Sequence, residues 1–381
     1  MVYLDNSATT RVRPEVLEEI IDVNLNCYGN PSSLHRMGLM AEKKVEEARK
    51  SVAKLLNATP QEIYFTGCGT ESNNIAIFGI LSDLREKNNI ITTKIEHPSV
   101  YNVFKELEKK CQVKYLDTDN KGKINLAQLE EMIDENTKLV SLAHVNNEIG
   151  VIQDLDNIAR VIKSKNRNTK LHVDGVQSYG KLKIDVKKVP IDTMAFSSHK
   201  IHGPKGVGGL YVRAGLKLNS LIFGGGQERG LRSGTENTPG IVGFGKACEL
   251  IFENFEEENE RLYKLRNEYI KRLKEIEDIK FNSLTDEEGA PHIINLSFKN
   301  VPGEVLVHYL EGKNIFVSTG SACSSKARDN RILDAIKISK DYEGTIRISL
   351  GYFNNFEEVD YVIENIKQSV NEIRLITNRR R

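Results

Sequence analysis

Apolar residues follow two different spacings along the first two thirds of the chain. From about residue 14 to 250, segments with apolar residues three and four positions apart, typical of helices, alternate with short runs rich in β-branched residues, typical of strands. The strand-like runs are "EIYFTG" from 62, "NIITTKI" from 89, "QVKYLD" from 112, "KLVSLAHV" from 138, "KLHVDG" from 170, "DTMAFSS" from 192 and "GGLYV" from 208. This alternation predicts an α/β fold with a mostly parallel, seven-stranded sheet.

The pattern changes near residue 256. A highly charged helical segment over 256–279 is followed by two strand-like runs, "HIINLSF" and "TIRISLG", and by a final amphipathic helix. We therefore expect a large domain over 14–255 and a smaller α/β domain formed by 1–13 and 256–381.

Composition narrows the possible partners. The chain has 54 Lys and Arg against 53 Asp and Glu, a net charge of +1, which gives no electrostatic indication of direct nucleic-acid or membrane binding. No targeting segment and no apolar stretch long enough to cross a bilayer is seen, so we expect a cytoplasmic protein. A specific RNA or protein partner is still compatible with this composition.

Cysteine and histidine spacing gives no indication of a disulfide framework or a metal site. The five cysteines are scattered, with no CxxC pair, and His199 and His202 lack a neighbouring carboxylate motif. We predict no bound metal. Four of the cysteines are interpreted as small core residues: Cys27, Cys68, Cys111 and Cys248.

Several predicted strands end in polar residues that are suited to chemistry. The segments after them are "TGCGTES", "IEHPS", "HVNNE", "VDGVQ" and "SSHK". In open α/β sheets, ligands bind in the crevice at the carboxyl ends of the strands, so these segments are expected to converge on one site.

Lys200, in "SSHKIHGPKG", is the candidate for a covalent cofactor site. A lysine can bind pyridoxal phosphate as a Schiff base, and this cofactor also needs a carboxylate on its pyridine nitrogen. Asp174 ends a predicted strand 26 residues before Lys200. Gln177, three residues later, is placed to reach the ring hydroxyl.

The cofactor phosphate requires hydrogen-bond donors, and Gly69 and Thr70 lie at a predicted helix start where free N–H groups favour an anion. Ser197 and His199, beside the lysine, add a hydroxyl and an imidazole. His97 ends another strand, where it can cover the ring, and Asn147 ends a fourth. Each of these residues is common in turns, but their combination favours a pyridoxal phosphate site.

The same residues lie in longer motifs, among them "YLDNSATT", "YGNPSSLH", "GCGTESNN", "IEHPSV", "HVNNEIGVIQ", "HVDGVQSYGK", "SSHKIHGPKGVG", "GGGQERGLRSGTEN", "STGSACSS" and "IRISLGYFN". Nearly from end to end, the sequence resembles the cysteine desulfurases, pyridoxal-phosphate enzymes of aminotransferase fold type I, class V. The resemblance implies that Lys200 forms the Schiff base, that His97 stacks on the ring and moves protons, and that Asp174 holds the pyridine nitrogen. It further implies that Gln177 and Asn147 face the ring oxygen and the substrate, and that Thr70, Ser197 and His199 hold the phosphate.

Three more residues take their roles from the resemblance. Thr235, in "RSGTEN", joins the phosphate site of the neighbouring subunit, which implies a homodimer. Arg347, in "IRISLG", binds the α-carboxylate of the substrate, a task suited to a bidentate guanidinium. Cys323, in "TGSACSS", is the catalytic thiol, on the loop that the smaller domain is expected to carry.

The implied reaction converts L-cysteine to L-alanine and leaves the sulfur on Cys323 as a persulfide, for delivery to iron–sulfur cluster assembly or to tRNA thiolation. The chain ends soon after its last predicted helix, whereas housekeeping relatives use a longer tail to dock an iron–sulfur scaffold, so both acceptors stay open. The alternatives are a selenocysteine lyase or another class V enzyme, and a catalytically silent protein of sulfur metabolism. Cys323 argues against a transaminase, and Lys200, Asp174 and Cys323 together argue against a silent protein.

Overall fold

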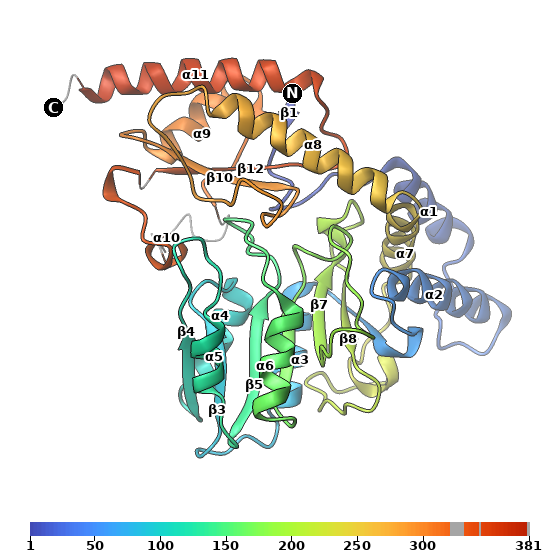
Figure 1. Ribbon diagram of the computed structural model, residues 1–381. Coiled ribbons are helices and arrows are strands. Elements are labelled where there is room, and N and C mark those ends of the chain that lie inside the picture. Colours follow the sequence, from blue (N-terminus) through green and yellow to red (C-terminus); the bar gives the residue numbers. More distant parts are fainter. Residues whose placement is uncertain (321–330, 343, 379–381) are drawn as a thin grey trace.

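The structure is a computed structural model that describes residues 1–320, 331–342 and 344–378. Its main feature is one seven-stranded sheet (Figure 1) with the order β2-β8-β7-β6-β5-β3-β4. The strands are β2 (Ile63–Thr66), β3 (Asn89–Thr93), β4 (Gln112–Leu116), β5 (Thr137–Ala143), β6 (Lys170–Asp174), β7 (Thr193–Ser197) and β8 (Gly208–Val212). All seven predicted strands are present, and only β8 runs antiparallel to its neighbours, which confirms the mostly parallel sheet.

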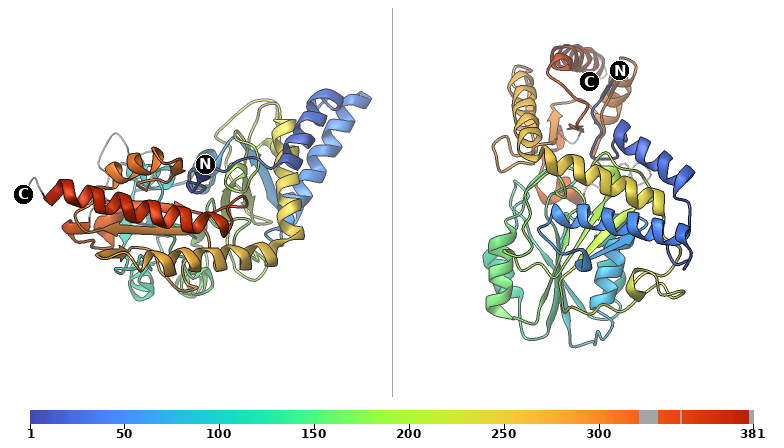
Figure 2. Two further views of the ribbon diagram at one scale, coloured as in Figure 1. Left: turned by 90° about the horizontal axis from the view of Figure 1, so that it is seen from above. Right: turned by 90° about the vertical axis from the view of Figure 1, so that its right-hand side faces the viewer.

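Helices cover both faces of this sheet, as Figure 2 shows. One face packs against α2 (Arg36–Lys54), α5 (Leu126–Met132), α6 (Leu155–Lys165) and α7 (Thr238–Glu253), and the other against α3 (Gly69–Ile80) and α4 (Pro98–Leu107). Helix α1 (Pro14–Asn26) packs beside α7. Because both faces are covered, β3, β7 and β8 are buried along their whole length.

Side chains just before several helices satisfy the first free backbone N–H groups. Asp154 caps α6 by accepting the N–H of Asn157 at 3.1 Å, and Asn125 and Asn237 do the same for α5 and α7. Each of these helices therefore starts at a defined residue.

A second body lies above the carboxyl ends of the large sheet (Figure 1). Within the described residues it contains the antiparallel sheet β12-β10-β9, the parallel pair of β1 and β11, and four helices. The elements are β1 (Val2–Tyr3), α8 (Phe255–Leu273), β9 (Ile279–Phe281), β10 (Ile293–Phe298), α9 (Gly303–Glu311), β11 (Ile315–Phe316), α10 (Arg331–Ala335), β12 (Thr345–Ser349) and α11 (Glu357–Asn378). One buried apolar cluster joins Val2 and Leu4 to residues between 262 and 373. The domain boundaries at residues 13 and 255 stay a prediction.

Among the described residues, no helix combines the length and the apolar character that crossing a membrane requires.

Candidate active site

A cavity of about 280 Å³ lies where the strand ends meet the second body. Strands β2, β3, β5, β6 and β7 run in the same direction, so their carboxyl ends reach one edge of the sheet. The cavity is lined by ten of the residues selected from the sequence: Gly69, Thr70, His97, Asn147, Asp174, Gln177, Ser197, His199, Lys200 and Arg347. The expected convergence of polar strand ends is therefore observed.

Lys200 lies in a short 3₁₀ turn, Ser198–Lys200, directly after β7. Its Nζ donates to the carbonyl oxygens of Ser7 and Ala8, at 2.5 and 2.8 Å. Both carbonyls belong to the N-terminal segment, which thus forms a wall of the cavity. No role was expected for Ser7 and Ala8 from the sequence, although both lie in the motif "YLDNSATT".

Asp174 is the last residue of β6 and is buried. Its Oδ1 accepts the N–H of Val176 at 3.0 Å, and its Oδ2 accepts from Asn73 Nδ2 at 2.9 Å. The carboxylate is therefore held in one orientation while it still faces the cavity. Asn73 was missed by the sequence analysis, although the quoted motif "GCGTESNN" contains it.

His97 is half-buried at the start of α4, and its Nδ1 lies 2.8 Å from the hydroxyl of Ser99. Burial lowers the pKa of His97, and the nearby Lys200 adds to this effect, although Asp174 opposes it. His97 is thus neutral at neutral pH.

Gln177 presents a hydrogen-bond donor to the cavity. Its Nε2 donates to the carbonyl of Ser7 at 2.9 Å, while its Oε1 lies 3.3 Å from Nε2 of His292. An amide oxygen only accepts, so His292 donates here, and burial lowers the pKa of His292 well below its usual value. One N–H of the Gln177 amide is left for a ligand.

The residues around the end of β7 fit a phosphate group. The hydroxyls of Ser7 and Ser197 are buried and have no hydrogen-bond partner in the described part of the chain. Helix α3 begins at Gly69 without a side-chain cap, so its first N–H groups are available to an anion. Burial lowers the pKa of His199 to about 4, with a further contribution from Lys200, so this imidazole can donate without carrying charge. The Ser7 and Ser197 hydroxyls and the uncapped backbone N–H groups at the start of α3 match the donors that the phosphate of pyridoxal phosphate needs.

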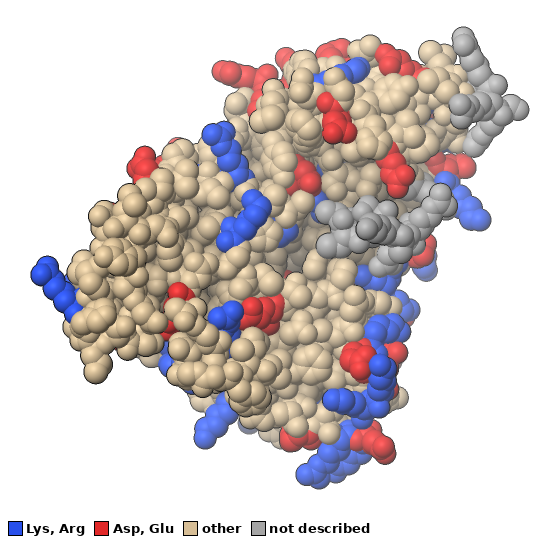
Figure 3. Space-filling view, turned by 180° about the vertical axis from the view of Figure 1, so that it is seen from behind, with Lys and Arg blue, Asp and Glu red and all other residues tan. Residues whose placement is uncertain are grey.

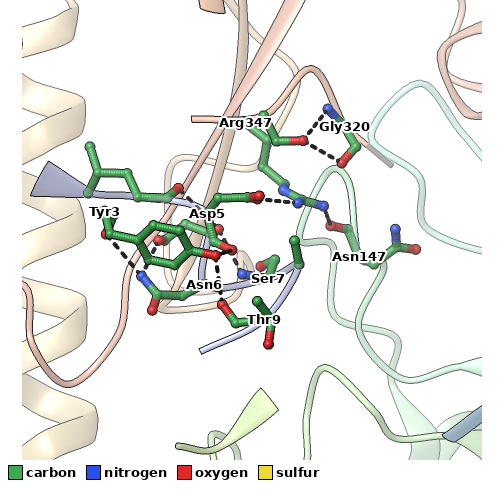
Figure 4. Close-up of polar contacts among 12 residues, drawn as sticks. Tyr3, Asp5, Asn6, Ser7, Thr9, Asn147, Gly320 and Arg347 are labelled. Carbon is green, nitrogen blue, oxygen red and sulfur yellow. Dashed lines mark hydrogen bonds and ion pairs between the residues drawn. The ribbon is translucent and has the colours of Figure 1, made fainter. Parts of the chain in front are cut away.

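Arg347 in β12 approaches from the second body (Figure 4). Its Nη2 forms an ion pair with Asp5 at 2.7 Å, and its Nη1 donates to the carbonyl of Asn147 at 2.7 Å. The guanidinium is buried, yet its Nε has no hydrogen-bond partner in the described residues. Arg347 thus keeps donor capacity beside the cavity, and Asp5 is a further site residue that the sequence analysis missed.

Two selected residues are not part of this cavity as described. Thr235 lines a separate cavity of about 100 Å³ together with Arg232 and Asn237. Cys323 lies outside the described residues. Cys68 was expected in the core with three other cysteines, but this prediction is wrong: Cys68 is only half-buried and lines the active-site cavity, because it is the residue at which the chain turns from β2 into α3.

Charged side chains on the molecular surface are mixed in sign. On the face that Figure 3 shows, Lys and Arg are interspersed with Asp and Glu. This agrees with the balanced composition of the chain.

Comparisons with known proteins agree with this geometry. Residues 2–362 match the family described as aminotransferase class-V. The chain is 44% identical over 379 residues to "Cysteine desulfurase IscS" of Clostridium botulinum, covering 98% of this chain and 95% of that protein. It is 43% identical to the protein of the same name from Pectobacterium carotovorum, covering 98% and 93%.

Solved structures with a similar fold include proteins described as NifS-like. A "NifS-like protein" superposes with a TM-score of 0.92 at 42% identity, over 97% of this chain and 99% of that one. A structure described as "SspA in complex with cysteine" superposes with a TM-score of 0.82 at 35% identity, over 93% and 100%. The chain therefore belongs to the class V aminotransferases, a pyridoxal-phosphate-dependent enzyme family, and within it to the cysteine desulfurases.

Proposed function

We propose that the residues of this cavity bind pyridoxal phosphate and L-cysteine and transfer the substrate sulfur to Cys323, with release of L-alanine. The observation that carries the proposal is the meeting of Lys200, Asp174 and Arg347 at one cavity. A lysine, a carboxylate and a guanidinium are the groups needed for the cofactor aldehyde, the pyridine nitrogen and the substrate carboxylate.

On this proposal, Lys200 binds the cofactor covalently and Asp174 keeps the ring nitrogen protonated. Gln177 and Asn147 face the ring oxygen and the substrate, and His97 covers the ring. The bound cofactor supplies an electron sink for the carbanion formed at the substrate Cα. The phosphate is held by a set of donors that surround the end of β7: Gly69, Thr70, Ser197 and His199.

Arg347 binds the substrate α-carboxylate through donors that its contacts with Asp5 and Asn147 leave unused. Substrate Cα then loses its proton to a base in the cavity. The thiolate of Cys323 attacks the substrate sulfur, an S–S bond forms, and the Cβ–S bond breaks with its electron pair remaining on the carbon side. Protonation of that carbon and return of a proton to Cα give L-alanine, and Cys323 keeps the sulfur as a persulfide.

The proposal extends to the assembly and the partners of the enzyme. We propose a cytoplasmic homodimer in which Thr235 completes the phosphate site of the partner subunit. Thr235 is exposed and lies outside the active-site cavity of its own subunit, which supports this arrangement. The persulfide is delivered to an acceptor protein of iron–sulfur cluster assembly or tRNA thiolation.

Alanine release from L-cysteine under reducing conditions tests the thiol assignment. Wild type should release alanine, and Cys323→Ser should lose at least about 10²-fold in rate because it lacks the attacking thiol. Cys68→Ser is the matched control, since it removes a thiol that lines the same cavity and should retain most of the rate. Equal rates for wild type and Cys323→Ser, or a loss in Cys68→Ser alone, would contradict the proposal.

The dimer has its own test. Light scattering on the purified chain should give twice the monomer mass of 43.0 kDa, and Thr235→Val should weaken cofactor binding without changing that mass. A monomer with full cofactor affinity would exclude the shared site.

A further inference from the structure

The hydrogen bonds of His97 determine which of its ring nitrogens carries the proton. His97 is the N-cap residue of α4, and its Nδ1 accepts the backbone N–H of Ser99 at 3.1 Å. Pro98, between them, has no N–H, so this bond satisfies the first free donor of the helix. A backbone N–H can only donate, so Nδ1 of His97 must be unprotonated.

A second donor points to the same nitrogen. The Ser99 hydroxyl lies 2.8 Å from His97 Nδ1 and also 2.8 Å from Asn73 Nδ2. The Asn73 nitrogen donates to Ser99 Oγ, so the hydroxyl hydrogen is directed to Nδ1.

The orientation of the Asn73 amide has independent support. Its Nδ2 also lies 2.9 Å from the Asp174 carboxylate, which accepts, and its Oδ1 lies 3.0 Å from Nε2 of His172. Burial lowers the pKa of His172 to about 3, so this ring is neutral. Its Nδ1 lies 2.9 Å from the Thr193 hydroxyl, which can donate to it, and its Nε2 then donates to Oδ1 of Asn73, since an amide oxygen only accepts. Asn73, His172 and Asp174 are all buried. The network thus has one consistent assignment, and it places the single proton of neutral His97 on Nε2.

The other ring nitrogen, Nε2, is the one left for a ligand, because His97 lines the cavity and Nε2 has no hydrogen-bond partner within the described residues. A neutral imidazole with its proton on Nε2 and two donors on Nδ1 can donate to a ligand but has no free lone pair with which to take a proton from it.

Resting on the proposed function, we propose that Ser99 and Asn73 are positioning residues that hold His97 as a hydrogen-bond donor through Nε2. His97 therefore orients the ligand and does not take the α-proton of the substrate.

Nitrogen NMR of the full-length protein tests the proton position without turnover. In histidine-¹⁵N-labelled protein, with and without cofactor, the His97 signals are assigned by their loss in His97→Gln. We expect a protonated Nε2 and an unprotonated, hydrogen-bonded Nδ1. Ser99→Ala should shift the Nδ1 signal while the backbone cap keeps the tautomer, and Ser369→Ala, which removes another buried hydroxyl, should leave it unchanged. A protonated Nδ1, or exchange between the two tautomers in wild type, would overturn the proposal.

Exchange of the α-proton of L-alanine in D₂O tests whether His97 is the base that removes this proton. Gln can place an amide N–H where His97 has Nε2–H, but it cannot act as a base. His97→Gln should therefore exchange within about tenfold of wild type, whereas His97→Ala should be slower than His97→Gln. A loss of about 10²-fold or more in both variants, the range expected for removal of a general base, would overturn the assignment. If wild-type enzyme fails to exchange, the proposed function fails, and the NMR result still decides the tautomer.

Discussion

Arg49 and Arg347 are both buried beside a carboxylate, but they differ in how many of their donors are used. In α2, Nη1 and Nη2 of Arg49 donate to the two oxygens of Glu228, both at 2.9 Å. Nε of Arg49 donates to Glu46 at 2.9 Å, and Nη1 also reaches the carbonyl of Ile63 at 3.0 Å. Arg347 makes only two such contacts and keeps an unpartnered Nε in the described structure.

This difference separates a structural ion pair from one that serves a ligand. Glu228 also accepts the N–H of Phe65 at 2.9 Å, so the Arg49 pair ties α2 and β2 to the loop that carries Glu228, with little donor capacity left over. A buried guanidinium with unused donors is costly unless something binds to it, and Arg347 lies at the cavity where a substrate carboxylate is needed. The comparison predicts that mutations at the first pair change stability and that mutations at the second change substrate binding.

The largest effect is expected from Glu228→Gln, which places an amide NH₂ against the Arg49 guanidinium and leaves this buried charge with only the exposed carboxylate of Glu46 as its partner. Breaking such a pair costs about 3–5 kcal/mol, so the free energy of unfolding in urea should fall by that order. The activity of the fraction that stays folded should be unchanged.

Glu256→Gln is the matched control for that experiment. It removes the same carboxylate from an ion pair with Lys183 whose side chains are 80% and 82% exposed. The change in unfolding free energy should stay within about 0.5 kcal/mol. A similar loss of unfolding free energy in Glu228→Gln and Glu256→Gln would contradict the structural role of the Arg49–Glu228 pair.

The second-largest effect is expected from Arg347→Lys, which keeps the positive charge but replaces the planar guanidinium with an ammonium group. The loss of two charge-assisted hydrogen bonds to the substrate carboxylate, about 1.5–3 kcal/mol each, should lower kcat/KM for L-cysteine by about 10²-fold or more. Steady-state kinetics and thermal unfolding on the same preparation separate activity from stability. A kcat/KM within threefold of wild type would remove Arg347 from the substrate site.

The smallest effect is expected from Asp5→Asn. The amide oxygen still accepts from Arg347, but a negative charge next to the substrate carboxylate is gone. Since like charges repel, KM for L-cysteine should fall about threefold, a change of roughly 0.5–1 kcal/mol. A higher KM would mean that Asp5 acts mainly by orienting Arg347, and Asp5→Ala, which removes the acceptor too, would then show a larger increase.

The helices, the strands and the polar residues at the strand ends could be predicted from the sequence. Lys200, Asp174 and His97 each lie at or just after the end of a strand-like run, and parallel strands bring such positions to one edge of the sheet. For this reason nine of the selected residues could be assigned to one site before their positions in space were known, whereas Arg347 took its role from the family resemblance.

The distant segments that complete this site could not be predicted in the same way. Asp5 and Arg347 are 342 residues apart, and the carbonyls that accept from Lys200 are 193 and 192 residues away from it. Cys68 has the small side chain of a core residue, yet the turn into α3 places it at the cavity. Local periodicity records which face of an element is apolar, whereas these contacts depend on how the second body packs over the sheet, and no local pattern encodes that packing.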